Sequence, residues 1–313
     1  MNHAIPDAFG RGPALASNPS ATTATFMIRT LFTATSIGTA CMLAGFGLFT
    51  APAPLSAVDA IDPGRFVWYD LMTKDVSAAK RFYGGLLGWQ FENTKRGDRP
   101  YVLARLGADP VAGIVDVSAL SDAAPQWISF MAVPDVDKTV ALVRFGGGKV
   151  LAEPREVASI ARAAVVSDPQ GAPLGVAQLH REIRGVVDPS RPVASRFFWQ
   201  EYLAGDAAKA LEFYKSLAGY ESSITDARLG IEYHVLRTTM RPRAGLFQLP
   251  ESSDVLPTWL PYVFVEDPAG LAARVPGLGG RVLLPADPAR RNGSLVVIAD
   301  PGGAPLALQR YPF

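Results

Sequence analysis

The sequence predicts an α+β protein built from two tandem copies of one domain. Two observations lead to this prediction. The chain repeats itself at an offset of 131 residues, which becomes 132 after one inserted residue. Each copy also shows the order strand, helix, strands twice, which is two βαβββ units. A repeat of this length is that of a whole domain, because solenoid repeats are only about 20–50 residues long.

The two copies share residues at corresponding places along their whole length. The matched pairs are Trp68 and Trp199, Phe82-Tyr83 and Phe213-Tyr214, Trp127 and Trp259, and Asp168-Pro169 and Asp300-Pro301. Each element of one copy therefore predicts the same element in the other.

The first unit opens with a strand and a helix. Residues 66–72 alternate, which places Trp68, Asp70 and Met72 on one face and Val67, Tyr69 and Leu71 on the other. Asp75 is a good N-cap for a helix over 76–87, and Gly88 is a good residue to end it. Residues 101–106 and 111–117 then read as short strands.

The second unit repeats this order. Residues 127–133 predict a strand, and Asp135 caps a helix that runs to about Phe145 and is stopped by three glycines. Strands follow at 149–152 and 163–166. An Asp-Pro-x-Gly turn at Asp168 precedes the closing strand, 174–178.

Length and composition agree with two domains. The chain has 313 residues, of which 49% are hydrophobic, and a formal net charge of +1. Without a cluster of Lys and Arg we expect no nucleic-acid partner. We place a leader at 1–60, the first domain at 62–181, a Gly- and Pro-containing linker at 182–193, and the second domain at 194–312.

The leader predicts export. Residues 1–26 are rich in Ala, Ser, Thr and Pro and are expected to be disordered. Arg29 precedes an uncharged stretch, 30–55, which is the layout of a signal peptide whose true start would be Met27. Cys41 follows small residues, as in a bacterial lipoprotein. We therefore expect a periplasmic or membrane-anchored protein, with a lipoprotein, a signal cleaved near 57–60 and an uncleaved anchor as the open alternatives.

The two copies resemble the vicinal oxygen chelate superfamily, which contains glyoxalase I, bleomycin-resistance proteins and extradiol dioxygenases. The residues that carry the resemblance are Asp75, Phe82-Tyr83 and Gly88-Trp89, their counterparts Asp206, Phe213-Tyr214 and Gly219-Tyr220, and the turns at Asp168 and Asp300. The chain is most similar to the tandem-domain proteins described as glyoxalase-like. The resemblance implies that the two βαβββ units of each domain form one open, half-barrel sheet.

The resemblance also implies metal ligands at fixed positions, and this sequence lacks them. The family's metal enzymes carry His or Gln on the first strand of each unit and Glu on the closing strand. The corresponding residues here are Trp68, Ile128, Trp199, Leu260, Gly175 and Ala307. The histidines, His3, His180 and His234, lie elsewhere and are expected to be ordinary residues. We therefore expect no family-type metal site and no cofactor.

The concave side of each sheet is where a ligand is expected. Its expected lining is Trp68, Asp70, Met72 and Phe130 in the first domain and Trp199, Glu201, Leu203 and Tyr262 in the second. The aromatic rings suit a flat organic molecule or a cation. Asp70 and Glu201 are candidate general acids or bases. Alternatively, these carboxylates bond to neighbouring backbone or arginine, and the tryptophans fill the barrel.

Three functions remain open from the sequence. The first is an exported protein that binds a small hydrophobic or aromatic molecule without a metal. The second is a lyase, isomerase or dioxygenase of the same superfamily with an unconventional site. The third is a structural module that forms a homodimer through its sheet edges. One fold can host all three, so the geometry of the site has to decide.

Overall fold

The computed structural model describes residues 62–120, 124–180, 190–226, 232–239 and 241–311. These residues form two mixed sheets of eight strands each, with helices on one face of each sheet. The α+β fold with two tandem glyoxalase-like domains is thereby confirmed.

The first sheet contains two βαβββ units. Their elements are β1 (Phe66–Thr73), α2 (Val76–Leu87), β2 (Gln90–Arg96), β3 (Arg99–Leu106), β4 (Asp109–Asp116), β5 (Gln126–Ala132), α3 (Val136–Phe145), β6 (Lys149–Val157), β7 (Ala161–Ser167) and β8 (Pro173–Leu179). The strand order is β2-β3-β4-β1-β5-β8-β7-β6. The antiparallel pair β1–β5 joins the two units into one open half-barrel.

The second sheet repeats this order as β10-β11-β12-β9-β13-β16-β15-β14. Its elements are β9 (Phe197–Ala204), α4 (Ala207–Ala218), β10 (Glu221–Asp226), β11 (Tyr233–Thr238), β12 (Arg241–Gln248), β13 (Thr258–Phe264), α5 (Pro268–Arg274), η2 (Pro276–Leu278), β14 (Arg281–Leu284), η3 (Arg291–Gly293), β15 (Leu295–Ala299) and β16 (Pro305–Gln309). The last helix is the main departure from the first copy, because α5 is shorter than α3 and is followed by a 3-10 turn.

The helix limits follow the predicted caps. Asp75 accepts a hydrogen bond from the Ala78 backbone N–H at 2.8 Å, and Asp206 does the same for Lys209 at 3.0 Å. Gly88 ends α2 in the left-handed conformation, with φ 74°, which a residue without a Cβ adopts readily.

The alternation predicted for the first strand is wrong at one position. The pairing of β1 with β5 shifts register between Phe66 and Trp68, as at a β-bulge. Val67 therefore packs on the same side as Trp68, while Tyr69 and Leu71 face the helices as expected. The pairing of β13 with β9 repeats this shift. Bulges are common at bends of curved sheets, and a period-two pattern does not reveal them.

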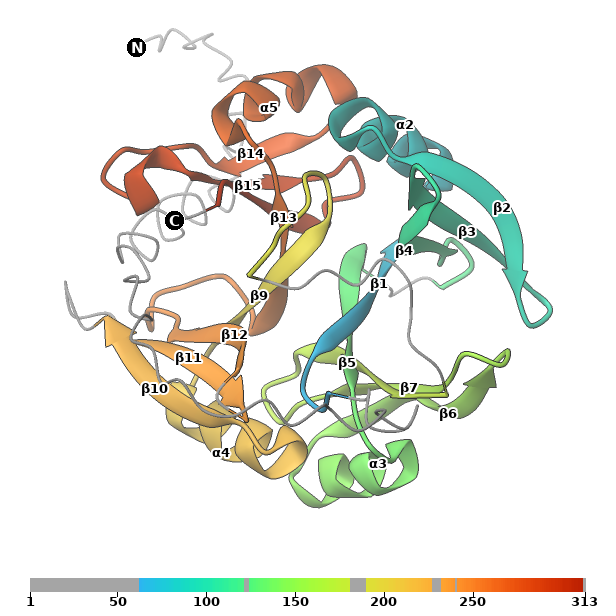
Figure 1. Ribbon diagram of the computed structural model, residues 1–313, viewed down its shortest axis with the longest axis vertical. Helices are drawn as coiled ribbons and strands as arrows, with labels where there is room; N and C mark the ends of the chain where they lie inside the picture. The colour runs from blue at the N-terminus through green and yellow to red at the C-terminus, as the bar shows by residue number, and fades with distance from the viewer. Residues whose placement is uncertain (1–61, 121–123, 181–189, 227–231, 240, 312–313) are drawn as a thin grey trace, which may run out of the picture.

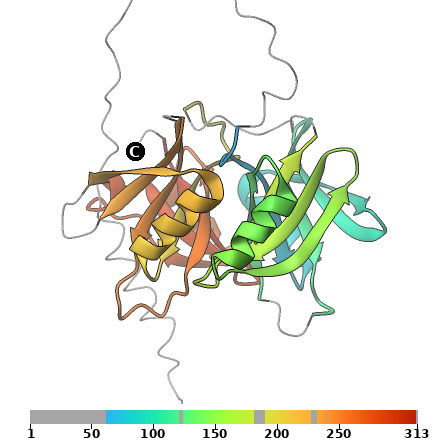
Figure 2. The ribbon, with the colours of Figure 1, turned by 90° about the horizontal axis from the view of Figure 1, so that it is seen from below.

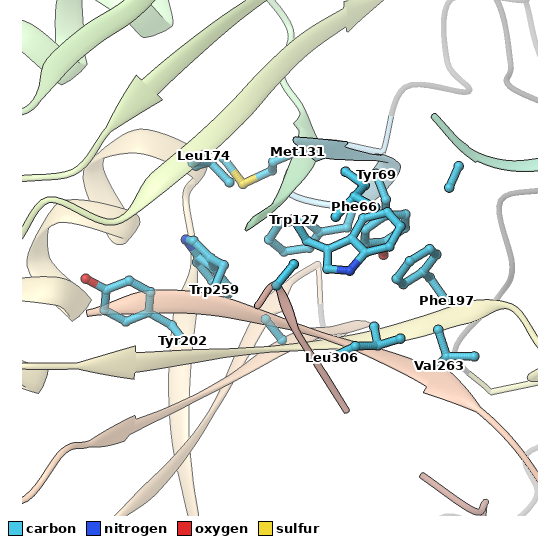
Figure 3. Packing of buried hydrophobic residues seen from close by; sticks show 14 of the residues in the cluster. Phe66, Tyr69, Trp127, Met131, Leu174, Phe197, Tyr202, Trp259, Val263 and Leu306 are labelled. Atoms are coloured by element: carbon cyan, nitrogen blue, oxygen red, sulfur yellow. The ribbon is translucent and has the colours of Figure 1, made fainter. Parts of the chain in front are cut away.

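The two domains share one hydrophobic core on their helix-bearing sides (Figure 3). The ring of Phe66 packs on Trp259 with centroids 5.0 Å apart, and Phe197 packs on Trp127 at 5.1 Å. These are repeat partners, so the interface has approximate two-fold symmetry. Near its centre Tyr69 stacks on Phe197 at 3.9 Å. Figure 2 shows α3 of the first domain beside α4 of the second.

Buried hydrogen bonds cross the same interface in both directions. The Tyr83 hydroxyl of the first domain donates to Asp300 at 3.1 Å, and Tyr214 of the second domain donates to Asp168 at 2.9 Å. Both acceptors belong to the Asp-Pro-x-Gly turns. Each turn therefore leads into the last strand of its own domain and also accepts a hydrogen bond from the other domain.

The predicted leader, including Met27 and Cys41, lies outside the described residues, as does most of the predicted linker. Within the described part of the chain, no helix is long and apolar enough to cross a membrane.

Candidate functional site

The inner face of each sheet, opposite the helices, carries a cluster of polar side chains centred on one carboxylate. In the first domain this is Asp70 on β1, which is 2% exposed. Its Oδ1 accepts hydrogen bonds from the Trp68 indole at 2.9 Å and from the Tyr101 hydroxyl at 2.7 Å. Trp68 is itself only partly buried.

Arg96, at the end of β2, completes this first cluster. Its guanidinium bonds both carboxylate oxygens of Asp70, at 2.5 and 3.0 Å, and lies 3.8 Å over the ring of Tyr101. Such a bidentate pair fixes both side chains in one orientation. The Arg96 side chain keeps 21% of its surface exposed, against 3% for Asp70.

The charges in this cluster hold each other in place. Burial is the largest single effect and would lower the pKa of Arg96. The charge and hydrogen bonds of Asp70, with smaller contributions from Tyr101, together outweigh it and raise that pKa above its usual value. Burial, and then the charge of Asp70, raise the pKa of Tyr101 well above its ordinary value. Tyr101 therefore keeps its proton and acts as a hydrogen-bond donor.

The second domain contains a matching cluster around Glu201 on β9, which is fully buried. Tyr233 donates to Glu201 at 2.8 Å, and Tyr262 donates to the other carboxylate oxygen. Arg291, in η3, bonds Glu201 at 2.5 Å. The indole of Trp199 donates to the Tyr233 hydroxyl at 3.3 Å.

The two clusters differ in the origin of the arginine and in exposure. Arg96 comes from the first βαβββ unit of its domain, whereas Arg291 comes from the second unit. Trp199 and Leu203 are each 5% exposed, while their counterparts Trp68 and Met72 are partly exposed. The inner face of the first domain is therefore the more accessible one.

The structure places all eight residues of the predicted lining on the inner faces, in two separate groups. Trp68, Met72 and Phe130 belong to one apolar cluster in the first domain, and Trp199, Leu203 and Tyr262 to another in the second. The carboxylates take the arginine-bonded form that the sequence left open as the alternative. Both accept several hydrogen bonds, so neither is a free base in this structure.

Tyr262 belongs to the lining predicted from the sequence, but Tyr101, Tyr233 and the two arginines were not predicted. Tyr101 and Tyr233 could have been found, because they occupy equivalent places in the repeat at the offset of 132 residues. Gly113 lies beside Tyr101 and Gly245 lies beside Tyr233, and these two glycines are also equivalent in the repeat. A Cβ at Gly113 would lie 1.6 Å from the Tyr101 hydroxyl oxygen, and one at Gly245 would lie 2.1 Å from that of Tyr233. The arginines have no such signal, because they come from non-equivalent segments.

The residues at the family's metal-ligand positions do not fit a metal ion. Trp68 and Ile128 offer no donor atom of the kind that divalent metals prefer. At Gly175, where the family's enzymes carry Glu, a Cβ would lie 2.3 Å from the ring of Phe130, which fills that space. Among the described residues, no three His, Cys, Asp or Glu side chains lie together as a ligand group. His180 instead pairs with Glu156 at 2.9 Å.

Comparison with known proteins agrees with this fold. A family model described as Glyoxalase/Bleomycin resistance protein/Dioxygenase superfamily matches residues 65–176. A Mycobacterium tuberculosis protein named "Putative glyoxylase CFP32" is 31% identical over 241 residues, which cover 76% of this chain and 91% of that protein. The chain belongs to the glyoxalase/bleomycin resistance protein/dioxygenase superfamily. Another similar protein is the anthracycline biosynthesis protein DauV of Streptomyces sp. strain C5, 29% identical over 259 residues, 77% of this chain and 91% of DauV.

Solved structures of other proteins share the fold. The Mn(II)-bound glyoxalase from Novosphingobium aromaticivorans superposes with a TM-score of 0.53 at 17% identity, over 79% of this chain and 82% of that one. The 2,2',3-trihydroxybiphenyl 1,2-dioxygenase from Sphingomonas wittichii superposes with a TM-score of 0.53 at 14% identity, over 80% and 91%. At these identities the likeness establishes the fold only.

Proposed function

We propose that this superfamily member binds a small, flat aromatic molecule on the inner face of its first domain, without a family-type metal. The observation that carries the proposal is the partial exposure of Trp68 and Met72 beside the buried carboxylate cluster. An accessible indole and a thioether offer a flat apolar surface to an aromatic ring. The equivalent pair Trp199 and Leu203 is buried and offers none.

The packing around Trp68 supports a positioned binding surface. Its indole N–H is fixed by Asp70, and apolar side chains of β5 and β7 pack beside it. Asp70 is held by Arg96 and Tyr101, so we propose a positioning role for this carboxylate in place of the general acid or base considered above. Glu201 has the same role in the buried cluster of the second domain.

The relatives' names point to the same chemical class. DauV is named an anthracycline biosynthesis protein, and so is the similar protein DnrV of Streptomyces peucetius. Anthracyclines are flat polycyclic aromatic molecules, which is the shape that an exposed indole face accepts. For this chain the class is part of our proposal, and the individual ligand is left to experiment.

We also propose that the protein acts after export, in the periplasm or at the membrane. The proposal rests on the positive start and apolar stretch over 27–55 in the sequence. A ligand met outside the cytoplasm is then the expected partner.

Titration with flat aromatic probes tests the binding proposal. Anthraquinone-2-carboxylate and its neutral amide would be added to the purified protein, with tryptophan fluorescence and thermal stability as readouts. We expect one molecule bound per chain, loss of binding in Trp68→Leu, and unchanged binding in Trp199→Leu variants that remain folded. If neither probe binds, or if Trp68→Leu binds like the parent, the proposal is wrong.

A further inference from the structure

We propose that Arg96 selects aromatic ligands that carry an anionic oxygen, such as a carboxylate or a phenolate. This inference rests on the proposed aromatic site of the first domain and names the chemical class of its ligand. It would make Arg96 a specificity-determining residue and the natural ligand an aromatic acid or acidic phenol.

The first support is the orientation of the pair formed by Arg96 and Asp70. The side chain of Asp70 is 3% exposed, whereas the side chain of Arg96 is 21% exposed. The pair is neutral overall, but its positively charged member is the more exposed of the two. Tyr101 adds no negative charge, because burial raises the pKa of its hydroxyl well above the ordinary value. An anion approaching this side is therefore attracted.

The second support is the number of N–H groups that Arg96 has left. A guanidinium has five N–H donors, and the two bonds to Asp70 use two of them. A further hydrogen bond joins Arg96 to Tyr101, which leaves two N–H groups with no acceptor recorded among the described residues. The stack on Tyr101 and the bidentate bond hold the guanidinium still, so a ligand oxygen would find donors already in position.

The third support is the proximity of the guanidinium to the proposed stacking surface. The indole N–H of Trp68 bonds the same carboxylate oxygen, Oδ1 of Asp70, that accepts a bond from Arg96. The indole and the guanidinium therefore flank one atom. A ring lying on Trp68 can place an oxygen substituent toward Arg96 without leaving that surface.

In the second domain, the arginine of the equivalent cluster is buried from solvent. Arg291 has a side chain only 6% exposed, and it bonds Gln309 at 3.2 Å as well as Glu201. Its guanidinium is thus committed to internal partners and out of reach of a ligand. This contrast restricts the inference to Arg96 and predicts a single anion-selective site per chain.

The experiment compares the carboxylate and amide probes on the full chain and on variants of Arg96. We expect the parent to bind anthraquinone-2-carboxylate about tenfold or more tightly than its amide at neutral pH. Arg96→Gln should abolish this preference, and Arg96→Lys should retain part of it because the charge remains. The matched control is Arg105→Gln, since Arg105 bonds Glu92 on the exposed surface and should leave the preference unchanged.

A second variant distinguishes loss of the charge preference from loss of the folded structure. Arg96→Gln alone strands the buried Asp70, so the double variant Arg96→Gln/Asp70→Asn removes both charges and should fold as judged by circular dichroism. A folded double variant that binds both probes equally supports the inference. If the parent binds both probes equally through Trp68, or if the folded double variant still prefers the carboxylate, Arg96 is not the selector while the aromatic site stands. If neither probe binds, the aromatic site and the selector fail together.

Discussion

Tyr83 and Asp300 lie 217 residues apart in the sequence and are joined by a buried hydrogen bond of 3.1 Å. Tyr83 belongs to α2 of the first domain, and Asp300 begins the closing turn of the second. The other oxygen of Asp300 accepts the Ala304 backbone N–H at 2.9 Å, which shapes that turn. One carboxylate thus serves both the local turn and the contact between domains.

Removing the Tyr83 hydroxyl should destabilise the whole chain. We expect Tyr83→Phe to lower the free energy of unfolding by about 1–3 kcal/mol, because a buried acceptor loses its donor. Urea unfolding of the parent, Tyr83→Phe, Asp300→Asn and the double variant measures the coupling. A coupling energy of about 0.5 kcal/mol or more is expected, and strictly additive effects would contradict a direct bond.

The same carboxylate should give the stability a pH dependence. Burial raises the pKa of Asp300, although its hydrogen bonds from Ala304 and Tyr83 act in the opposite direction. The folded chain then keeps this proton to higher pH than the unfolded chain, whose Asp pKa is about 3.9. The stabilisation that Asp300 contributes is therefore complete below the pKa of the unfolded chain. It is lost as pH rises through the raised pKa of the folded chain.

Asp300→Asn removes this titration and serves as the comparison. The free energy of unfolding of the parent minus that of Asp300→Asn should decrease as pH rises from about 4. Denaturant unfolding at a series of pH values measures it. A difference that grows with pH would mean that the pKa of Asp300 is lowered in the folded chain.

The two inner-face clusters should respond differently to loss of the carboxylate charge. Glu201→Gln leaves Arg291 buried without a counter-charge, so we expect a loss of about 3–5 kcal/mol in unfolding free energy. Asp70→Asn leaves Arg96, which can be hydrated where it is exposed, so a smaller loss of about 1–3 kcal/mol is expected. Urea unfolding of both variants gives the comparison, and equal losses would show that exposure of the arginine does not matter.

The space for the tyrosine in each cluster should depend on glycine. Gly113→Ala would place a methyl group 2.4 Å from Oδ1 of Asp70 and closer still to Tyr101. We expect a loss of about 1–3 kcal/mol in unfolding free energy from the displaced side chains. The control is Gly277→Ala, since a Cβ there meets no atom within 4 Å. Similar melting temperatures for the two variants would be evidence against the steric requirement.

Export is tested on the leader itself. We expect the mature protein, expressed in a bacterial host with its native leader, to lack at least residues 1–40 in intact-mass measurement. If Cys41 carries a lipid, Cys41→Ser should move the protein from the membrane fraction to the soluble one. A full-length chain recovered from the cytoplasm would show that the segment is not an export signal.

Much of the fold could be predicted because it depends on local and repeated signals. Asp75 and Gly88 mark the limits of α2 through backbone hydrogen bonding and φ, which neighbouring residues alone determine. The repeat then allowed each element predicted in one domain to be assigned to the other. The bulge beside Trp68 escaped prediction, because it depends on the curvature of the sheet and the pairing with β5.

The sequence by itself determined the tandem organisation, the superfamily, and the strand face shared by Trp68 and Asp70. The first two follow from the repeat and its motifs, and the third follows from the side-chain period, which holds from Trp68 onward because the bulge lies before it. Only the tertiary structure decided that Arg96 and Arg291 neutralise the two carboxylates. It alone also decided that Trp68 stays accessible while Trp199 is buried. The arginines come from segments with no fixed offset to their partners, and exposure depends on what packs above a residue, so neither is encoded in a local pattern.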